Sequence, residues 1–560
     1  MKKNLLILLF AIAAGLYVLN WQFRSLSLVH PTFVAWLGGG DWEANFLSWH
    51  FFRHEPWSFP LGRIAKLGYP SGTSVALTDP TPIFAYPFRL FSAWLPADFQ
   101  YAGIWFTVCF VLQALFGAWL VELLTPNIIL IFIGSFLFTL SPILLQRVRH
   151  ISLCAHWLIL AFLWLYFQKR ERTKRDFVFL YALNFIGWWS HPYLGGILSV
   201  LSICALFRWS WRDDRLDTRR FIQYVLTLFL FDGIHFYIGG YLSNPLNDMQ
   251  TNSWGDCALH LNSLFLTMSY SNFTFLPYTY PDPGTEFMYL GVGLIALAAM
   301  ACILYYRRDA QENFCTAHMG ERADFTTQNM KPLLITCAAL TMFALSNRIY
   351  LDHTHVILRY PLPHFVLHNF GMFRDCGRFF WPCYYLIIYF SIAMTLKHYR
   401  RMAAGGILLA VLGLQFYEFY HVICPRPLTT VFPMNSPLKD KFWDHLERFK
   451  GIEIFPNTLS INHESDFFFF SYLAASRGMF ITAIHAARYK HAQDIYFLNS
   501  ENMIKGGTMD PSTLYIIPDR FVSTWSPYLK KMAQCSRIDE YYVCFQPNRP
   551  NAKIEPNERS

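Results

Sequence analysis

The chain has 560 residues, of which 54% are hydrophobic and only 15% are charged, and its formal net charge is +9. This composition excludes an ordinary soluble protein. Many apolar runs approach the roughly 20 residues that a helix needs to cross a bilayer. The basic residues lie in short loops between these runs, which is typical of membrane topology and argues against nucleic-acid binding. We therefore expect a polytopic membrane protein.

The first apolar run covers residues 4–21 and follows Lys2 and Lys3. It is similar to a secretory signal peptide, but no small-residue cleavage site follows it. We interpret it as an uncleaved first transmembrane helix. Because the two lysines precede it, the N-terminus is expected in the cytoplasm.

A long loop, residues 22–100, comes next and contains the stretch GGGDWEANFLSWHFFRH at 38–54. Three glycines free the backbone, and Asp41 then occupies the position of a helix N-cap. A helix that starts there would present four side chains on one face: Trp42, Phe46, Trp49 and Arg53. Such a face suits a helix that lies flat in the headgroup layer of a membrane. Asp41 and Glu43 would stand at its start, either as catalytic acids or as a cap and a solvated side chain.

Ten further apolar runs follow, so that the chain holds about eleven spans. They cover residues 101–124, 127–145, 151–167, 177–190, 193–207, 221–241, 287–306, 332–346, 379–396 and 402–420. When the direction of the spans alternates, the basic connections 168–176, 208–220, 307–331 and 397–401 all fall in the cytoplasm, as the positive-inside rule requires. The loop 244–286, which contains no Lys or Arg, falls outside. The expected fold class is mainly α, a polytopic helical bundle.

An odd number of spans places residues 422–560 outside the membrane, after a transmembrane domain of residues 1–421. Three strand-like runs lie at 451–455, 514–517 and 540–545. They alternate with helix-like segments and predict a small extracytoplasmic α/β domain. Cys535 and Cys544 flank the last run, where they would form a disulfide or remain two buried thiols.

The unusual polar residues gather in the loops that we expect on the external side. In addition to the two acids of the first loop, they are His50, Arg53, Asp79, Arg147, His150, His191, Arg374 and Arg378. A membrane face that collects carboxylates, histidines and arginines from distant loops is typical of an active site on a helical scaffold. We predict that these eight residues bind substrate.

Transfer from a phosphate-linked donor to an acceptor is the chemistry that suits this set. A carboxylate takes the proton of an acceptor hydroxyl, and arginines hold a phosphate bidentately while it leaves. Asp41 is the first candidate for the base and Glu43 the second. Arg374 and Arg378 are candidates for the phosphate ligands, whereas the histidines donate hydrogen bonds or, as a less favoured alternative, bind a metal.

These residues also have structural interpretations. Arg374 and Arg378 lie four apart beside aromatic residues, which suits side chains that snorkel to a membrane interface. Arg147 and His150 are also consistent with an ordinary helix end. The histidine–proline and aspartate–proline steps at positions 191 and 79 both suit turns.

One acidic residue lies inside an apolar run. Asp232 falls within 221–241, and His235 follows one helical turn later. A charge at this depth is costly and is usually paired or functional. A proton relay would favour a transporter, but we expect a local structural pair between the two side chains.

Five segments together carry a family resemblance. They are GGGDWEANFLSWHFFR at 38–53, GYPSGTSVALTDPTPI at 68–83, RVRHISLCAHWLIL at 147–160, SHPYLG at 190–195 and FRDCGRFFWP at 373–382. With this architecture the chain resembles the multi-pass glycosyltransferases of the GT-C superfamily, and it looks closest to an uncharacterised bacterial family of that type. The resemblance covers nearly the whole chain.

The resemblance implies a function. Asp41 would be the catalytic base, and the donor would be a sugar linked to polyprenyl phosphate. The acceptor would be an envelope glycan, lipid or protein on the outer face of the bacterial inner membrane. Two departures from the superfamily matter: Trp42 separates the two acids, and the sequence lacks a second external acidic motif. We therefore expect that no cofactor is required, with a divalent cation as the less favoured alternative.

Two other function classes stay open. A transporter or flippase for a lipid-linked or anionic substrate predicts internal repeats, helices broken at mid-membrane depth and several buried charges. An accessory subunit of an envelope-assembly machine predicts that Asp41 is dispensable. The lack of repeats and the concentration of polar residues at one surface favour the enzyme, although architecture alone fixes function weakly.

Overall fold

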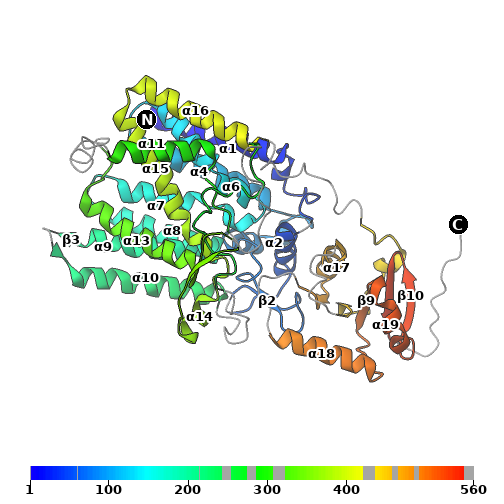
Figure 1. Ribbon diagram of the computed structural model, residues 1–560. Coiled ribbons are helices and arrows are strands. Elements are labelled where there is room, and N and C mark those ends of the chain that lie inside the picture. Colours follow the sequence, from blue (N-terminus) through cyan, green and yellow to red (C-terminus); the bar gives the residue numbers. More distant parts are fainter. Residues whose placement is uncertain are drawn as a thin grey trace. The chain divides into compact units, whose positions relative to one another are not determined.

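The chain divides into two compact units in a computed structural model (Figure 1). Unit 1 comprises Met1–Pro31, Tyr101–Phe236 and Thr251–Leu428, and unit 2 comprises Thr32–Gln100, Tyr237–Gln250 and Thr429–Ser560. The structure describes residues 2–38, 40–59, 61–212, 215–241, 254–273, 286–306, 322–352, 354–420, 436–456, 465–484 and 491–547. Most of the long first loop thus shares a unit with the C-terminal residues, a grouping that the boundary expected at residue 421 does not anticipate.

Unit 1 is a bundle of helices. They are α1 (Lys2–Phe23), α4 (Ala102–Glu122), α5 (Ile128–Thr139), α6 (Pro142–Arg147), α7 (Trp157–Phe167), α8 (Lys174–Ser190), α9 (Pro192–Trp209), α10 (Thr218–Ile238), α11 (Val292–Tyr306), α13 (Thr327–Leu345), α14 (His364–Phe370), α15 (Trp381–His398) and α16 (Arg401–Phe419). Short 3₁₀ helices are η1 (Ser27–Val29), η3 (Ile151–Cys154) and η6 (Cys376–Phe380). Two small hairpins pair β3 (Trp211–Arg212) with β4 (Arg215–Leu216) and β5 (Arg348–Tyr350) with β6 (Val356–Arg359).

Helix α4 is central to this bundle, because it packs against α1, α5 and α7. Helix α7 is buried along almost its whole length. Several helices begin at residues suited to the position. The side chain of Asn127 accepts hydrogen bonds from Ile129 N and Leu130 N at the start of α5, and prolines occupy the first turns of α6, α9 and α15.

Six helical segments are long and apolar enough to cross a membrane. They are α1, α4, α9, α10, the continuous segment Cys376–His398 and α16. Each of the other five predicted runs also contains a helix, namely α5, α7, α8, α11 or α13, but these are shorter or less apolar. The predicted polytopic helical bundle is therefore present, whereas the count of eleven spans is not confirmed.

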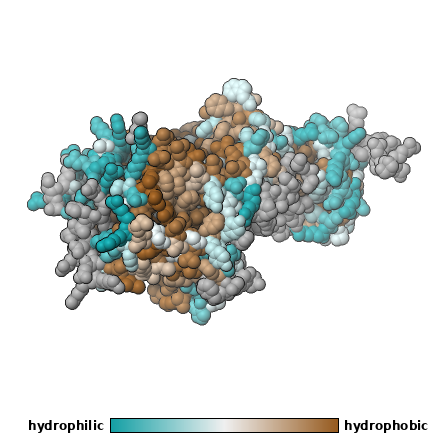
Figure 2. Space-filling model, turned by 90° about the horizontal axis from the view of Figure 1, so that it is seen from above, coloured by the Kyte–Doolittle hydropathy of each residue, from teal (hydrophilic) through white to brown (hydrophobic). Residues whose placement is uncertain are grey.

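Large apolar side chains face outwards on several of these helices. On α10, Leu226, Phe229 and Leu230 are each at least 60% exposed. Met402 and Leu409 of α16, the helix at the top of Figure 1, are exposed as well, and Figure 2 shows a broad hydrophobic area on this face of unit 1. A helix that is apolar on its outer face needs lipid around it. The chain is accordingly a membrane protein.

The predicted pair of Asp232 and His235 on α10 is wrong. The Asp232 carboxylate accepts a hydrogen bond from the Ser199 hydroxyl of α9, at 2.7 Å. The His235 ring instead packs against Phe185 and Phe231, and within the described part of the chain neither of its nitrogens has a hydrogen-bond partner. Asp232 is thus held by a neighbouring helix and not by its own.

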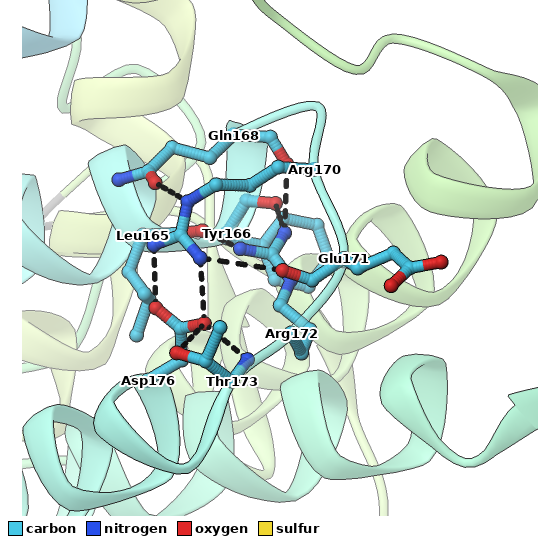
Figure 3. Close-up of polar contacts among 8 residues, drawn as sticks. All are labelled: Leu165, Tyr166, Gln168, Arg170, Glu171, Arg172, Thr173 and Asp176. Carbon is cyan, nitrogen blue, oxygen red and sulfur yellow. Dashed lines mark hydrogen bonds and ion pairs between the residues drawn. The ribbon is translucent and has the colours of Figure 1, made fainter.

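The basic connection between α7 and α8 is an ordered turn (Figure 3). Arg172 donates to the carbonyl oxygens of Leu165, Tyr166 and Gln168 at the end of α7. Asp176 closes a capping box at Thr173 and also binds the Arg170 guanidinium through both carboxylate oxygens. These cations satisfy the last carbonyls of one helix and support the first turn of the next.

Unit 2 combines helices with a five-stranded sheet. Its helices are α2 (Gly40–Phe52), α3 (Pro82–Leu90), α17 (Ser465–Ser476), α18 (His491–Lys505) and α19 (Asp519–Leu529), with η2 (Ser92–Trp94) and η7 (Lys441–Asp444). The sheet contains β7 (Gly451–Ile454), β8 (Phe480–Ile481), β9 (Thr513–Ile517), β10 (Gln534–Ile538) and β11 (Tyr541–Phe545). A separate hairpin pairs β1 (Arg63–Ile64) with β2 (Thr73–Ser74).

The strand order of the sheet is β10-β11-β9-β7-β8. Strands β7, β8 and β9 are parallel, and β9, β11 and β10 are antiparallel. The three strand-like runs in the sequence correspond to β7, β9 and β11, so the small C-terminal sheet is confirmed. Cys535 and Cys544 face each other across the β10–β11 hairpin and form a disulfide.

Helix α2 is buried nearly all round, which differs from the expected one-faced surface helix. Its Phe46 ring stacks with Phe468 and Tyr472 of α17, and the Trp49 indole donates to the Phe99 carbonyl. The helix begins at Gly40, so Asp41 lies within the first turn and not at the N-cap position. The aromatic face of α2 is therefore part of a protein core.

Candidate functional site

A buried cluster of charged residues in unit 1 is centred on Arg378. Its guanidinium lies 2.8 Å from Asp375 Oδ2 and 3.5 Å from Glu286 Oε2. It also lies 4.7 Å from the centre of the Tyr193 ring, in a cation–π arrangement. All four side chains are buried. The start of Cys376–His398 and the start of α9 thus contribute to a single charged cluster.

Two more arginines complete this cluster. Arg147, the last residue of α6, lies 3.0 Å from the second carboxylate oxygen of Glu286. Arg374 lies 3.5 Å from Asp375, and its side chain is 46% exposed. We call these five charged residues, Arg147, Glu286, Arg374, Asp375 and Arg378, the arginine network. It contains three cations and two anions, so it carries one excess positive charge.

The backbone around the network brings its members together. Gly377 N donates to the Cys257 carbonyl, and Cys257 N donates to the Arg374 carbonyl. The Tyr193 hydroxyl accepts a hydrogen bond from Asp375 N. A Cβ atom on Gly377 would lie 2.5 Å from Glu286 Cβ, so only glycine lets the acid approach this closely.

The neighbouring arginines keep the Asp375 carboxylate of the network ionised. Burial alone would raise the pKa of Asp375, but the guanidiniums of Arg378, Arg374 and Arg147 outweigh it and hold that pKa well below its ordinary value. Burial lowers the pKa of Arg147, while Glu286 opposes this effect, and an arginine remains charged under such conditions. The excess positive charge is therefore permanent.

Two predicted histidines lie together beside the network. The rings of His150 and His191 are 5.4 Å apart, and His191 stacks on Tyr193 at 5.3 Å. His191 Nδ1 accepts from Tyr193 N at the start of α9, so in the neutral ring the proton is on Nε2, which can donate. All five predicted residues of unit 1 thus belong to one connected group: Arg147, His150, His191, Arg374 and Arg378.

In unit 2, the acids of the first loop occupy the first turn of α2. The Asp41 side chain is exposed and that of Glu43 is buried. One turn later, the Asn45 amide donates to the backbone carbonyl of Asp79 and to the Thr81 hydroxyl. Asp79 has a left-handed φ of 53°. The predicted turn at Asp79 is thus joined to α2 through Asn45.

The side chains of His50 and Arg53 both contact other parts of unit 2. His50 stacks on Tyr472 at 4.9 Å and its Nε2 lies 3.1 Å from the Ser476 hydroxyl. Burial, together with the nearby His54 and Arg53, lowers the His50 pKa to about 3, so the ring is neutral near pH 7. Arg53 uses all five donors on Ser92 and on the backbone of residues 92–97. This arrangement leaves Arg53 no donor for a ligand.

Sequence reasoning missed three members of the site. Asp375 lies between the two arginines of FRDCGRFFW, three residues before Arg378, a spacing typical of an ion pair on one helical turn. Glu286 is the acid that directly precedes an apolar run in a loop without Lys or Arg. Tyr193 lies within SHPYLG, where only His191 had attracted attention. The first two could have been found by searching for counter-charges of the conspicuous arginines.

The arrangement can bind an anion. Guanidinium groups match the oxygens of phosphate in a bidentate geometry, and a buried site strengthens such contacts. A buried ion cluster is weak evidence for stability, because desolvation offsets the attraction between its charges. An excess cation beside a donating imidazole therefore indicates a ligand of negative charge.

Two family models match the chain. The model described as Domain of unknown function (DUF6311) matches residues 10–420, and the model of the DUF6311 C-terminal domain matches residues 442–546. No curated protein matches the chain.

Proposed function

Since the chain belongs to the DUF6311 family, a domain of unknown function, we propose an activity from the chemistry of its buried arginines: the protein is an integral membrane glycosyltransferase. It moves a sugar from a polyprenyl-phosphate-linked donor to an envelope glycan, lipid or protein acceptor. The reaction takes place on the outer face of the bacterial inner membrane. The N-terminus lies in the cytoplasm and the C-terminal domain lies outside.

The excess positive charge of the arginine network is the observation that carries this proposal. When the bond between sugar and phosphate breaks, negative charge grows on the phosphate oxygens. Preorganised guanidinium groups stabilise that charge more strongly in the transition state than in the ground state. Arg374 is half exposed and is therefore the member best able to reach an incoming phosphate. A lipid-linked phosphate suits a chain whose helices carry an apolar outer surface.

The base is proposed from the resemblance to GT-C enzymes. The acceptor hydroxyl oxygen attacks the anomeric carbon, the bond from that carbon to the phosphate oxygen breaks, and the phosphate leaves with the electron pair. The hydroxyl proton passes to the Asp41 carboxylate, which is exposed and thus accessible to an acceptor. Glu43 of the same helical turn is the second candidate.

Binding of the lipid phosphate is tested with the full chain in nanodiscs. Undecaprenyl phosphate is the probe, and undecaprenol, which lacks the phosphate, is the comparison. We expect Arg374→Ala to weaken binding of the phosphate about tenfold or more, the loss of a charge-assisted contact, without changing undecaprenol binding. The control is Arg175→Ala, which removes an exposed arginine at the start of α8. Equal binding of both lipids, or an unaffected Arg374→Ala variant, would overturn the phosphate role.

Catalysis is tested with Asp41→Asn, in membranes of a strain in which loss of the protein changes an envelope glycan. We expect normal insertion, intact binding of undecaprenyl phosphate and a loss of transfer of roughly a hundredfold or more, with a milder effect of Glu43→Gln. Full activity of Asp41→Asn would reject the enzyme hypothesis in favour of a transporter or an accessory subunit. That no cofactor is required stays a prediction, and the same assay in EDTA checks it.

A further inference from the structure

Unit 2 contains a cavity of about 540 Å³ that the predicted function does not use. It lies where the GYPSG segment of the first loop meets the turns before β7 and β8. Six of the residues that line it carry the argument: the cations Arg63, Lys66, Lys450 and Arg477, and the aromatic residues Tyr69 and Phe480. We call this cavity the basic pocket. Its volume is typical of sites that hold a small ligand.

The first loop forms one wall by joining the sheet. Leu67 pairs with Ile481 of β8 in parallel, the Lys66 carbonyl accepts from Ile481 N, and the Ile481 carbonyl accepts from Tyr69 N. The Gln493 amide of α18 donates to the Tyr69 carbonyl. The GYPSG turn is thus fixed by backbone contacts to the C-terminal sheet, and the walls of the pocket are positioned before any ligand arrives.

The cations of the pocket have few counter-charges. Among the described lining residues there is no acid. Arg477 forms a long ion pair with the exposed Asp444, at 3.6 Å, and the Lys66 ammonium donates to the Gly478 carbonyl. Arg63 and Lys450 are exposed at the rim. Four positive charges around one cavity favour a ligand with several negative charges.

The aromatic residues supply a flat apolar surface. The Tyr69 and Phe480 rings stack at 4.0 Å, and Tyr69 is 38% exposed. Gly451 of β7 makes room for Phe480, because a Cβ atom there would lie 2.2 Å from that ring. An exposed ring face next to cations matches a sugar, whose apolar face stacks on the ring while its acidic substituents meet the charges.

We propose that the basic pocket binds an acidic glycan, a chain of sugars that carry carboxylates. The charge of the whole unit favours this ligand over a nucleic acid. The three segments of unit 2 contain 19 Lys and Arg against 20 Asp and Glu, whereas nucleic-acid binders are strongly basic overall. Four of these 19 cations line the basic pocket, without an acid among the described lining residues. That the glycan is the acceptor of the transfer rests on the proposed function, but its binding does not.

The test measures binding of hexagalacturonate, an acidic hexasaccharide, to the full chain in nanodiscs. We expect neutral galactohexaose to bind at least about tenfold more weakly, because it lacks the carboxylates that meet the cations. Arg63→Gln with Lys450→Gln removes two exposed cations at the rim of the pocket and should weaken hexagalacturonate binding about tenfold or more. Tyr69→Ala should weaken it about fivefold through loss of the stacking surface. The matched control, Lys530→Gln with Lys531→Gln, removes two exposed cations of unit 2 outside the pocket.

Three outcomes would overturn the proposal. They are equal binding of the neutral hexasaccharide, unchanged binding by both pocket variants, and tighter competitive binding of a single-stranded oligonucleotide or of phosphatidylglycerol vesicles. Circular dichroism and thermal unfolding confirm that the variants are folded. The failure of this proposal can be told apart from the failure of the proposed function. If hexagalacturonate binds but the Asp41→Asn variant retains full activity, glycan binding by the pocket is supported and the transferase is rejected.

Discussion

The arginine network of unit 1 and the basic pocket of unit 2 differ in how their cations are buried and paired. In unit 1, the arginine network places arginines beside two buried carboxylates, which compensate two of its three positive charges. In unit 2, the basic pocket leaves cations at a surface with little compensation, and the buried His50 is neutral. The difference predicts how each site responds to salt. Salt screens the attraction between buried charges weakly and the attraction between exposed charges strongly. Four predictions test this contrast, beginning with the largest expected effect.

Arg378→Met should be the most damaging change. It leaves Asp375 and Glu286 buried without their shared partner, and removing one member of a buried ion cluster costs about 3–5 kcal/mol of unfolding free energy. Thermal unfolding in nanodiscs measures the effect, and the half-exposed Arg374→Ala variant is the control, for which we expect little loss. Equal losses in both variants would show that burial does not distinguish the two arginines.

Gly377→Ala should disturb the same network without removing a charge. The new methyl group would meet Glu286 Cβ at 2.5 Å, and overpacking of this kind costs about 1–3 kcal/mol. We expect a lower unfolding temperature together with weaker binding of undecaprenyl phosphate. Gly406→Ala on α16 is the matched control, because its Cβ has no neighbour within 4 Å among the described residues. Wild-type behaviour of Gly377→Ala would contradict the tight approach of Glu286.

Salt should separate the two ligand sites. Raising NaCl from about 0.05 M to about 0.5 M should weaken hexagalacturonate binding to the basic pocket about tenfold and undecaprenyl phosphate binding less than about threefold, since screening acts mainly on exposed charges. Titrations of both probes against one protein preparation provide the comparison. A similar salt dependence of the two ligands would remove the distinction between the sites.

The smallest predicted effect concerns His50. Its pKa in the folded protein, about 3, lies below the ordinary value of 6.5, so the unfolded chain binds a proton that the folded chain excludes between these values. The contribution of the neutral His50 to the unfolding free energy is therefore complete above about pH 6.5, and it is lost as the pH falls towards 3. Between about pH 7.5 and 6 the expected loss is on the order of 1 kcal/mol. His50→Gln, which stays neutral, should show a smaller decline in unfolding temperature; an identical decline would assign the pH effect to other groups.

The sequence predicts elements well where a pattern is local. Every apolar run contains a helix, and the three strand-like runs are β7, β9 and β11, because hydrophobic periodicity reports burial directly. Strand β8 has only two residues, and β10 mixes polar and apolar residues in an edge hairpin, so neither shows that signal. The surface location expected for α2 was wrong for a related reason. An aromatic face suits either a membrane or a protein core, and α17, which covers it, lies more than 400 residues later.

The candidate site follows the same division. The arginines and histidines were conspicuous from their type and position, and the structure joins those of unit 1. Glu286 and Asp375 were missed because an ion pair depends on tertiary proximity, which one sequence does not reveal. For Arg53, local reasoning saw a cation in an external loop, whereas the fold uses it to bind the backbone of residues 92–97.

The contact between the first loop and the C-terminal sheet has a consequence for biosynthesis. Lys66 and its partner Gly478 are separated by 412 residues. At a synthesis rate of about 5–20 residues per second, roughly 20–80 s pass between the synthesis of Lys66 and that of Gly478, just before strand β8. During this time the Tyr69 ring and the backbone groups of the first loop have no sheet to join. A ribosome that stops before β8 therefore leaves a protein with most of its membrane helices and an unfinished basic pocket, a form on which quality-control proteases and chaperones can act.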